Sequence, residues 1–273
     1  MWVVLNSTEK YIALIFLTFS ILVVVLKGVY QILAKERFAW RKLFNKVKPI
    51  TEKERHFITA FLLPYQQFTH AERKQFLKRF AWFRSRKSFV FYGAIEEPEQ
   101  IKAYVTASAI LLTMGLRNYK YENSIRRIII YPSAYYSKIA KRYHLGEYNP
   151  RFKTLVFAAD ELAHGFRIPN DNKNLGLHEA AHALMFEFDK MRGWEARKFR
   201  LGIRKFKGLF ENPNFKKVLE GSTYFRPYSK TSFIEFFAVA VENFVESPSE
   251  FKTHYPGLFY LMTRIFNLGT STK

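Results

Sequence analysis

The chain has 273 residues, of which 48% are hydrophobic and 18% aromatic, which excludes a disordered protein and is enough for a substantial buried core. It contains no cysteine, which excludes a disulfide-stapled fold, a thiolate zinc site and a cysteine nucleophile. The 44 Lys and Arg against 23 Asp and Glu give a net charge of +21, which indicates an anionic neighbour, either nucleic acid or an acidic membrane surface.

The first element in chain order is an uncharged apolar segment, residues 11–26. If Lys27 snorkels to the interface, the segment continues to Ala34 and reaches the roughly twenty residues that a membrane-spanning helix needs. A cleaved signal peptide is the alternative, but the first ten residues have no basic cluster, and residues 29–31 make a poor cleavage site. We therefore predict a single transmembrane anchor over residues 1–34.

A basic juxtamembrane segment, residues 35–50, follows the anchor. The cations near the end of the apolar run are Lys27, Lys35, Arg37, Arg41, Lys42, Lys46 and Lys48. Positive charge beside a span stays on the cytoplasmic side, so the rest of the chain is expected in the cytoplasm. The same cations would bind anionic lipid headgroups, and this membrane-proximal surface would explain much of the +21.

The remaining chain, residues 51–273, shows neither repeats nor a low-complexity linker and is expected to form one domain. The first predicted elements are a helix that begins at a capping box of Thr69 and Glu72 and a buried helix that begins at Pro98. Two strands are predicted at residues 127–131 and 154–158, followed by a loop at 170–172. Three further helices are predicted, one from Leu177, one at residues 190–207 and one at 231–246. Helices with a few short strands predict a mainly helical α+β domain.

Residues 190–207 are strongly basic with interleaved aromatic side chains, a composition that also occurs in nucleic-acid-binding surfaces. Phe199, Ile203 and Phe206 are three or four residues apart, which is typical of an amphipathic helix with a solvated charged face. We favour this helix and keep nucleic acid as the less favoured partner.

The metal-binding and catalytic side chains are expected in residues 178–182, His-Glu-Ala-Ala-His, which form an H-E-x-x-H motif in a predicted helix. Because residues i and i+4 share a helix face, His178 and His182 would bind one zinc ion through their ring nitrogens. Glu179 would then lie close enough to accept a proton from the water that zinc activates. The motif occurs by chance in about one chain in a hundred of this length, so the alternative is a helix with partly exposed histidines and a surface glutamate.

A third ligand is expected in residues 231–246, an apolar stretch interrupted by Glu235 and Glu242. These glutamates are seven residues apart and so share a helix face, and a carboxylate among Phe, Ala and Val is costly to bury without a partner such as a metal. The alternative is that both face solvent. With the histidine pair, a glutamate would make a His2Glu site with an open position, the catalytic pattern of zinc. The other histidines are interpreted as surface or loop residues, with His56 and His70 in polar helices, His144 and His164 in loops, and His254 near a helix break.

The segment HEAAHAL, followed by Tyr228 and by EFFAVAVENFVESPSEF from Glu235, resembles the MtfA-like zinc metallopeptidases, the family typified by the Mlc titration factor. The resemblance covers about residues 60–268. It includes LLPYQQF before Thr69, IIIYP at 128–132, LGEY at 145–148 and PGLFYLM near the end of the chain.

The resemblance implies a zincin-like fold of the gluzincin type and aminopeptidase-type activity on peptides, with one Zn2+ per chain. The roles that it implies are zinc ligands for His178, His182 and Glu235, general base for Glu179, oxyanion donor for Tyr228, and a partner that orients a ligand histidine for Glu242.

Two departures from the family pattern are visible. Where the family often has Leu-Asp after the second histidine, this chain has Leu184 and Met185, and the nearest acids are Glu187 and Asp189. The apolar N-terminal segment is not part of the soluble family pattern, so the partner protein of the type member is not transferred to this chain.

The sequence predicts a membrane-anchored zinc peptidase acting on peptides or proteins. The competing interpretation is a non-catalytic, membrane-bound zinc-binding scaffold or regulatory binding protein.

Overall fold

The computed structural model describes residues 6–44, 46–137 and 141–268, with the backbone alone at 7, 9–10 and 31–44. The chain divides into two units, Met1–Lys46 and Val47–Lys273. The buried apolar side chains of the described residues all lie in the second unit, called the body below. The body therefore has its own hydrophobic core, which is the property of an independently folding domain.

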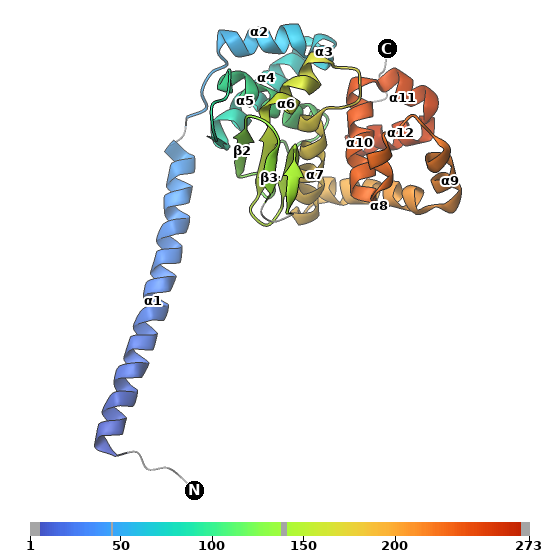
Figure 1. Cartoon of the computed structure of the whole chain (residues 1–273). Helices are drawn as coiled ribbons and strands as arrows, with labels where there is room; N and C mark the ends of the chain where they lie inside the picture. The colour runs from blue at the N-terminus through green and yellow to red at the C-terminus, as the bar shows by residue number, and fades with distance from the viewer. Residues whose placement is uncertain (1–5, 45, 138–140, 269–273) are drawn as a thin grey trace. The chain divides into compact units, whose positions relative to one another are not determined.

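The first unit contains helix α1, Ser7–Phe44, drawn in blue in Figure 1. Its segment Tyr11–Tyr30 is 20 residues long, is apolar enough to cross a membrane by length and composition, and is not buried against the protein. A signal sequence near an N-terminus has the same properties. The length and composition of the helix therefore fit both a membrane-spanning anchor and a signal sequence.

The body combines a small sheet with helices and ends in a wholly helical part (Figure 1). Its helices are α2 Glu52–Phe61, α3 Leu63–Gln66, α4 His70–Arg86, α5 Pro98–Leu111, α6 Ala159–Arg167, α7 Leu175–Lys190, α8 Trp194–Glu211, α9 Pro213–Gly221, the 3-10 helix η1 Pro227–Lys230, α10 Phe233–Glu246, α11 Pro248–His254 and α12 Pro256–Ile265. Its strands are β1 Ser88–Phe91, β2 Arg127–Tyr131, β3 Tyr135–Ser137, β4 Arg142–His144, β5 Gly146–Asn149 and β6 Thr154–Ala158. The predicted mainly helical α+β class is confirmed.

Four strands form one mixed sheet in the order β1-β2-β6-β5. Strands β1, β2 and β6 are parallel, whereas β5 is antiparallel to β6 at the edge and places Gly146 opposite Phe157. The β2 and β6 strands are rich in β-branched and aromatic residues, and Ile130 and Phe157 are completely buried. The strands predicted at 127–131 and 154–158 are confirmed with the same limits. Strands β3 and β4 form a separate antiparallel pair.

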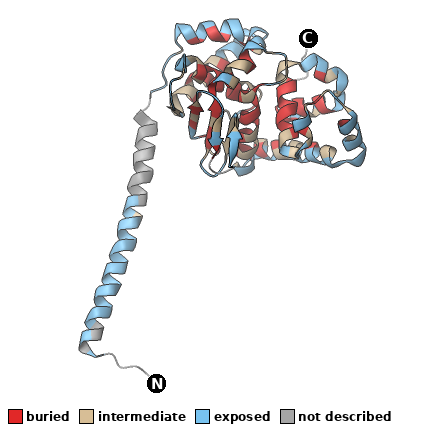
Figure 2. Cartoon of the chain, in the orientation of Figure 1, coloured by how far each residue is buried: buried red, intermediate tan, exposed pale blue. Residues whose placement is uncertain are grey.

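Helix α7 connects the sheet to the C-terminal helices. It packs against β5, β6 and α5 and also against α10. Figure 2 shows that buried residues are concentrated in the sheet region and in α10, with α7 between them. The residues of α7 therefore meet two parts of the core, and a site on this helix can recruit side chains from both.

The amphipathic helix predicted in the basic segment is confirmed as α8, but it begins at Trp194 and not at residue 190, because Gly193, with φ of 103°, interrupts the chain after α7. Two other local predictions were wrong. His144 lies in β4, where it pairs with Tyr135, and His164 lies in α6, so neither is in a loop. Strand β4 is short and polar, so its structure comes from pairing with β3, which a local pattern does not reveal.

Asn174 ties together three elements at the start of α7. Its Oδ1 caps the helix by accepting a hydrogen bond from the Leu177 N–H at 3.1 Å. Its Nδ2 donates to the Gly165 carbonyl and to Glu246 Oε1, each at 3.0 Å. Burial raises the pKa of Glu246 to about 8, against the opposing effect of the Asn174 hydrogen bond. Glu246 therefore retains its proton in the folded protein at pH values where the unfolded chain has lost it.

Glu246 should make the protein less stable as the pH rises. The folded state binds this proton more tightly than the unfolded chain, so its contribution is fully present below pH 4.5 and is lost between pH 4.5 and about 8. Glu246→Gln has no proton to lose, so the stability of this variant should fall less between pH 5 and pH 8, by on the order of a few kcal/mol. Thermal melts of both proteins at the two pH values measure the difference, and parallel pH dependences would contradict the prediction.

Candidate metal centre

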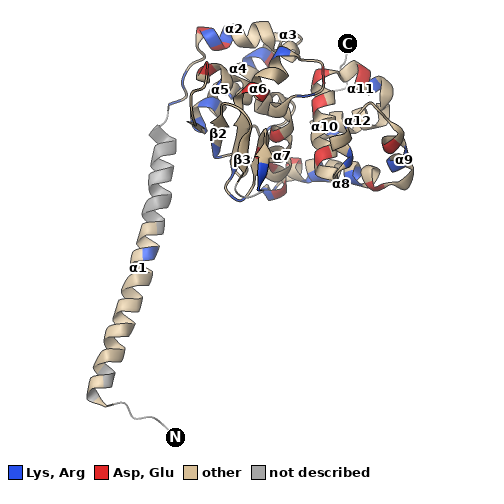
Figure 3. Cartoon of the chain, in the orientation of Figure 1, with Lys and Arg blue, Asp and Glu red and all other residues tan. Residues whose placement is uncertain are grey.

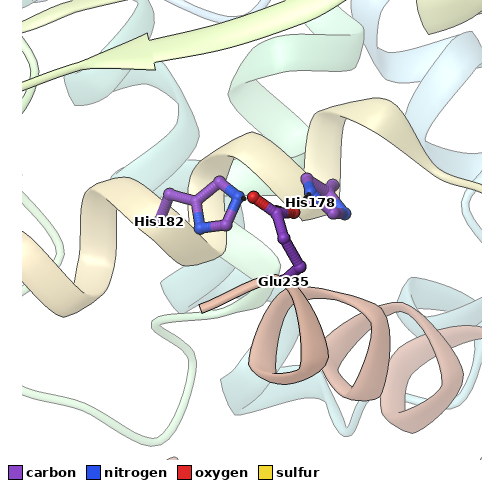
Figure 4. Close-up of side chains that lie close together, drawn as sticks. All are labelled: His178, His182 and Glu235. Atoms are coloured by element: carbon purple, nitrogen blue, oxygen red, sulfur yellow. Dashed lines mark hydrogen bonds and ion pairs between the residues drawn. The ribbon is translucent and has the colours of Figure 1, made fainter. Parts of the chain in front are cut away.

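Helix α7 places the two histidines of the H-E-x-x-H motif on one face. The rings of His178 and His182 are one helical turn apart, with centroids separated by 4.8 Å. The small residues Ala180, Ala181 and Ala183 are completely or almost completely buried and fix the helix against the core. Figure 4 shows both rings extending from α7 toward Glu235 of α10.

Glu235 lies in the first turn of α10, where its carboxylate could have closed a capping box. Ser232 caps the helix by accepting a hydrogen bond from the Glu235 N–H at 3.2 Å. In α2 and α4 the equivalent glutamate, three residues after Thr51 and Thr69, bonds back to the cap residue's backbone. In α10 the carboxylate faces the histidines instead (Figure 4). The helix N-terminus stabilises its negative charge in that position.

The three side chains converge closely enough to hold one metal ion. Glu235 Oε2 is 3.0 Å from His178 Nε2 and 3.6 Å from His182 Nε2, and ligand atoms from the three residues lie within 4.8 Å of one another. His182 Nδ1 is buried and has no hydrogen-bond partner within the described residues, whereas Nε2 faces Glu235 Oε2. Two imidazoles and a carboxylate suit zinc and leave a fourth position open. The residues present therefore fit a zinc ion.

The charges around the site favour a cation. Burial lowers the pKa of His178, but hydrogen bonds with the Glu235 and Glu242 carboxylates outweigh burial and raise this pKa to about 10. Burial alone would raise the pKa of Glu235, but its hydrogen bonds with His178 and His182 hold it below its usual range. A position where positive charge is stabilised this strongly is also favourable for a metal ion.

Glu242 lies two turns after Glu235 on the same face of α10, as the spacing predicted. Its Oε1 is 3.1 Å from His178 Nδ1, and its Oε2 accepts a hydrogen bond from the Arg226 guanidinium. Because Glu242 is only 1% exposed, Arg226 supplies the opposite charge that a buried carboxylate needs. The series Arg226, Glu242 and His178 orients the imidazole so that Nε2 faces Glu235.

Glu179 lies beside the edge strand β5. It is 6% exposed, and burial raises its pKa, a direction that suits a general base. A Cβ atom on Gly146 of β5 would lie 3.0 Å from Glu179 Oε1 and 2.6 Å from Leu175 Cδ1. With the Leu175 and Glu179 side chains in these positions, only glycine allows β5 to approach α7 this closely at the base.

A cavity of about 720 Å³ opens onto these residues. Tyr228 lines it with its ring 6.1 Å from the His178 ring, and its phenol keeps its proton because burial raises its pKa. Another part of the wall is apolar and is formed by Met185, Ile203 and Ile234. A cavity of this size and lining can accommodate a peptide side chain.

The structure brings the residues singled out in the sequence into one place. His178, Glu179, His182, Tyr228 and Glu235 line the cavity, and Glu242 lies directly behind His178. Of the remaining histidines, His56 and His70 are exposed, His164 pairs with Asp171, His254 contacts the Tyr224 ring, and His144 lines the cavity.

Sequence reasoning missed two residues of the site, Arg226 and Gly146. Arg226 precedes Pro227 in a segment without periodicity, so its contact with Glu242 has no local signal. Gly146 lies in a four-residue strand whose position beside α7 depends on pairing with β6. In the sequence, the LGEY segment that contains Gly146 is distinguished only by its resemblance to the family.

Comparison with known proteins agrees with this geometry. The sequence model of the glucose-regulated metallo-peptidases M90 matches residues 36–267, which include every residue of the site described above. An uncharacterised protein of Synechocystis sp. is 23% identical over 244 residues, which cover 84% of this chain and 88% of that protein. The chain belongs to the glucose-regulated metallo-peptidase family M90.

Proposed function

We propose that this protein is a membrane-anchored, zinc-dependent peptidase of the aminopeptidase type, with a gluzincin-type zincin fold. The observation that carries the proposal is the convergence of His178, His182 and Glu235 on one cavity, in a chain of a metallopeptidase family. The two histidines would bind one zinc ion through Nε2, and Glu235 would bind it through a carboxylate oxygen. Zinc, when bound, lowers the pKa of a water molecule toward neutrality and polarises the substrate carbonyl.

Glu179 would act as the general base. Its carboxylate would take a proton from the attacking water and pass it to the leaving amine as the peptide bond breaks. The buried position supports this role, since burial raises the pKa of Glu179 and so favours its acceptance of the proton from the attacking water. Gly146 keeps the strand backbone close to the carboxylate and limits its movement.

Two further side chains would support the reaction. Tyr228 would donate its phenolic hydrogen to the oxyanion of the tetrahedral intermediate, from its place on the cavity wall beside His178. Glu242 would accept the hydrogen on His178 Nδ1 and so hold the tautomer that presents the Nε2 lone pair to the metal. Arg226 would hold the Glu242 carboxylate in this position through the contact of its guanidinium with Oε2.

Metal content tests the proposal without any knowledge of the substrate. Elemental analysis of the purified chain should find about one zinc per chain, and His178→Ala and Glu235→Ala should each lose it. His56→Ala, which removes an exposed histidine of α2, is the matched control and should keep the zinc. Circular dichroism checks that the variants are folded. A folded wild-type protein that takes up no zinc on reconstitution would contradict the proposal. It would favour a binding protein without zinc-dependent catalysis.

The anchor is the second part of the proposal. Residues 1–34 would span the membrane once, residues 35–50 would form a basic juxtamembrane segment, and residues 51–273 would form the peptidase domain in the cytoplasm. In sealed right-side-out vesicles, external protease should leave the body intact until detergent is added. The mass of the protein extracted from the membrane should include residues 1–34. Digestion without detergent would reverse the orientation, and a mass lacking that segment would identify a signal peptide.

A further inference from the structure

Most of the positive charge lies outside the segment next to the apolar helix. Residues 1–46 contain seven Lys and Arg and two Glu, a net charge of +5, so the body carries +16 of the total of +21. The expectation that the juxtamembrane segment explains much of the charge is therefore wrong. Residues 192–217, which cover α8 and the start of α9, contain nine Lys and Arg against two Glu. Figure 3 shows the basic residues of α8 along this part of the body.

Helix α8 carries two different faces. Its inner face places Phe199 and Phe206 in the core, each at most 2% exposed. Its outward face carries five residues that fall within an arc of about 100° at 3.6 residues per turn. These residues, called the α8 outer stripe, are Trp194, Arg197, Lys198, Leu201 and Lys205.

The α8 outer stripe places two apolar side chains among cations at the protein surface. Trp194 is 74% exposed and Leu201 is 43% exposed, and they lie seven residues apart, two turns along the same line of the helix. The Glu195 carboxylate is bound to another segment of the body and not to the cations of the stripe, because it accepts the backbone N–H groups of Arg117 and Asn118 at 2.6 and 3.2 Å. A tryptophan and a leucine surrounded by Lys and Arg are typical of helices that lie in the interface of an anionic membrane.

We propose that the α8 outer stripe docks the body on an anionic lipid surface. The cations would attract the headgroups, and Trp194 and Leu201 would enter the interface between headgroups and acyl chains. Seven residues separate the end of α1 from the start of α2, a link of about 25 Å at most when extended. If α1 spans a membrane, this short tether keeps the stripe at high effective concentration near lipid. The docking proposal rests on the proposed membrane anchor, which brings the body close to lipid. It does not depend on zinc binding or on peptide hydrolysis.

Vesicle binding by the body alone, residues 47–273, tests the docking separately from the anchor and from catalysis. The body should sediment with phosphatidylcholine vesicles that contain 30% phosphatidylserine and not with pure phosphatidylcholine, and added salt should release it. The body contains two tryptophans, Trp82 and Trp194. Binding should shift the tryptophan emission to the blue, and Trp194→Phe should remove most of this shift.

A charge-matched pair of triple variants locates the surface. Arg197→Gln, Lys198→Gln and Lys205→Gln together should weaken binding to the anionic vesicles by about a hundredfold, because each cation near such a surface contributes about fivefold. Lys53→Gln, Lys74→Gln and Lys78→Gln together remove the same charge from exposed positions of α2 and α4 and should weaken binding much less. Neither set includes a residue that lines the cavity.

Three results would overturn the proposal. The first is equal binding to the neutral and anionic vesicles, and the second is an equal loss of binding in both triple variants. The third is tighter binding to a 20-base-pair DNA duplex than to the vesicles at physiological salt, abolished by the α8 variant, which would assign the surface to nucleic acid. Zinc content and hydrolysis of a soluble peptide do not enter these results, so the docking and the proposed peptidase activity fail independently.

Discussion

Glu179→Gln is expected to lose peptide hydrolysis by about a thousandfold while it keeps its zinc and its thermal stability. Glutamine has almost the shape of glutamate, so it preserves the packing of Glu179 against β5 but cannot accept a proton from the attacking water. The measurement is kcat/KM on a panel of amino-acid nitroanilides and short peptides, with zinc content and Tm determined on the same samples. Glu250→Gln, an exposed change on α11, is the matched control and should leave all three values unchanged.

The same experiment separates the peptidase from a zinc-binding scaffold. A peptidase requires activity in the wild-type protein that disappears in the variant while the metal remains. A wild-type protein that holds zinc but cleaves none of the panel would favour the scaffold. A variant that keeps more than a tenth of the wild-type activity would show that another group accepts the proton, and the role of Glu179 would be wrong.

Glu187→Ala is expected to cause the largest loss of stability, about 3–5 kcal/mol. The Glu187 side chain is 1% exposed and accepts five hydrogen bonds from the segment that precedes β2. Its Oε2 accepts the backbone N–H groups of Asn123 and Ser124 at 2.7 and 2.8 Å, and the Ser124 hydroxyl at 3.0 Å. Truncation would leave these donors without an acceptor and would separate α7 from that segment.

Urea unfolding followed by circular dichroism measures this loss. Asp189→Asn is the control on the same helix, because Asp189 is exposed and, among the described residues, pairs only with its neighbour Lys190, a pair worth less than about 1 kcal/mol. Its stability should lie within about 0.5 kcal/mol of the wild type. A loss below about 1 kcal/mol for Glu187→Ala would mean that water replaces the carboxylate at these donors.

The parts of the fold and the site that the sequence predicted are those encoded by local periodicity. Residues 127–131 and 154–158 are short apolar runs, the first ended by Pro132, and both are strands with these limits. The spacing of His178 and His182 fixes their common face on any helix. The seven-residue spacing of Glu235 and Glu242 does the same on α10, and both carboxylates face His178.

The parts that could not be predicted depend on contacts between distant segments. The sequence does not reveal the structural role of Glu187, because its five hydrogen-bond donors lie more than 60 residues away in the chain. The Arg226 contact with Glu242 joins two elements whose distance is set by the packing of η1 on α10. Strands β3, β4 and β5 are three or four residues long and largely polar, so pairing rather than composition determines them.

Because Gly146 has no side chain, position 146 is coupled to position 179, which lies 33 residues later in the sequence. Any larger residue there must displace the Leu175 and Glu179 side chains or move β5 away from α7, because its Cβ would lie 2.6 Å from Leu175 Cδ1 and 3.0 Å from Glu179 Oε1. A shorter acid at position 179 would relieve the crowding but would also withdraw the carboxylate along the helix. The residue at position 146 therefore affects where the acid at position 179 can lie, and in a directed-evolution library of this protein the two positions should be varied as one unit.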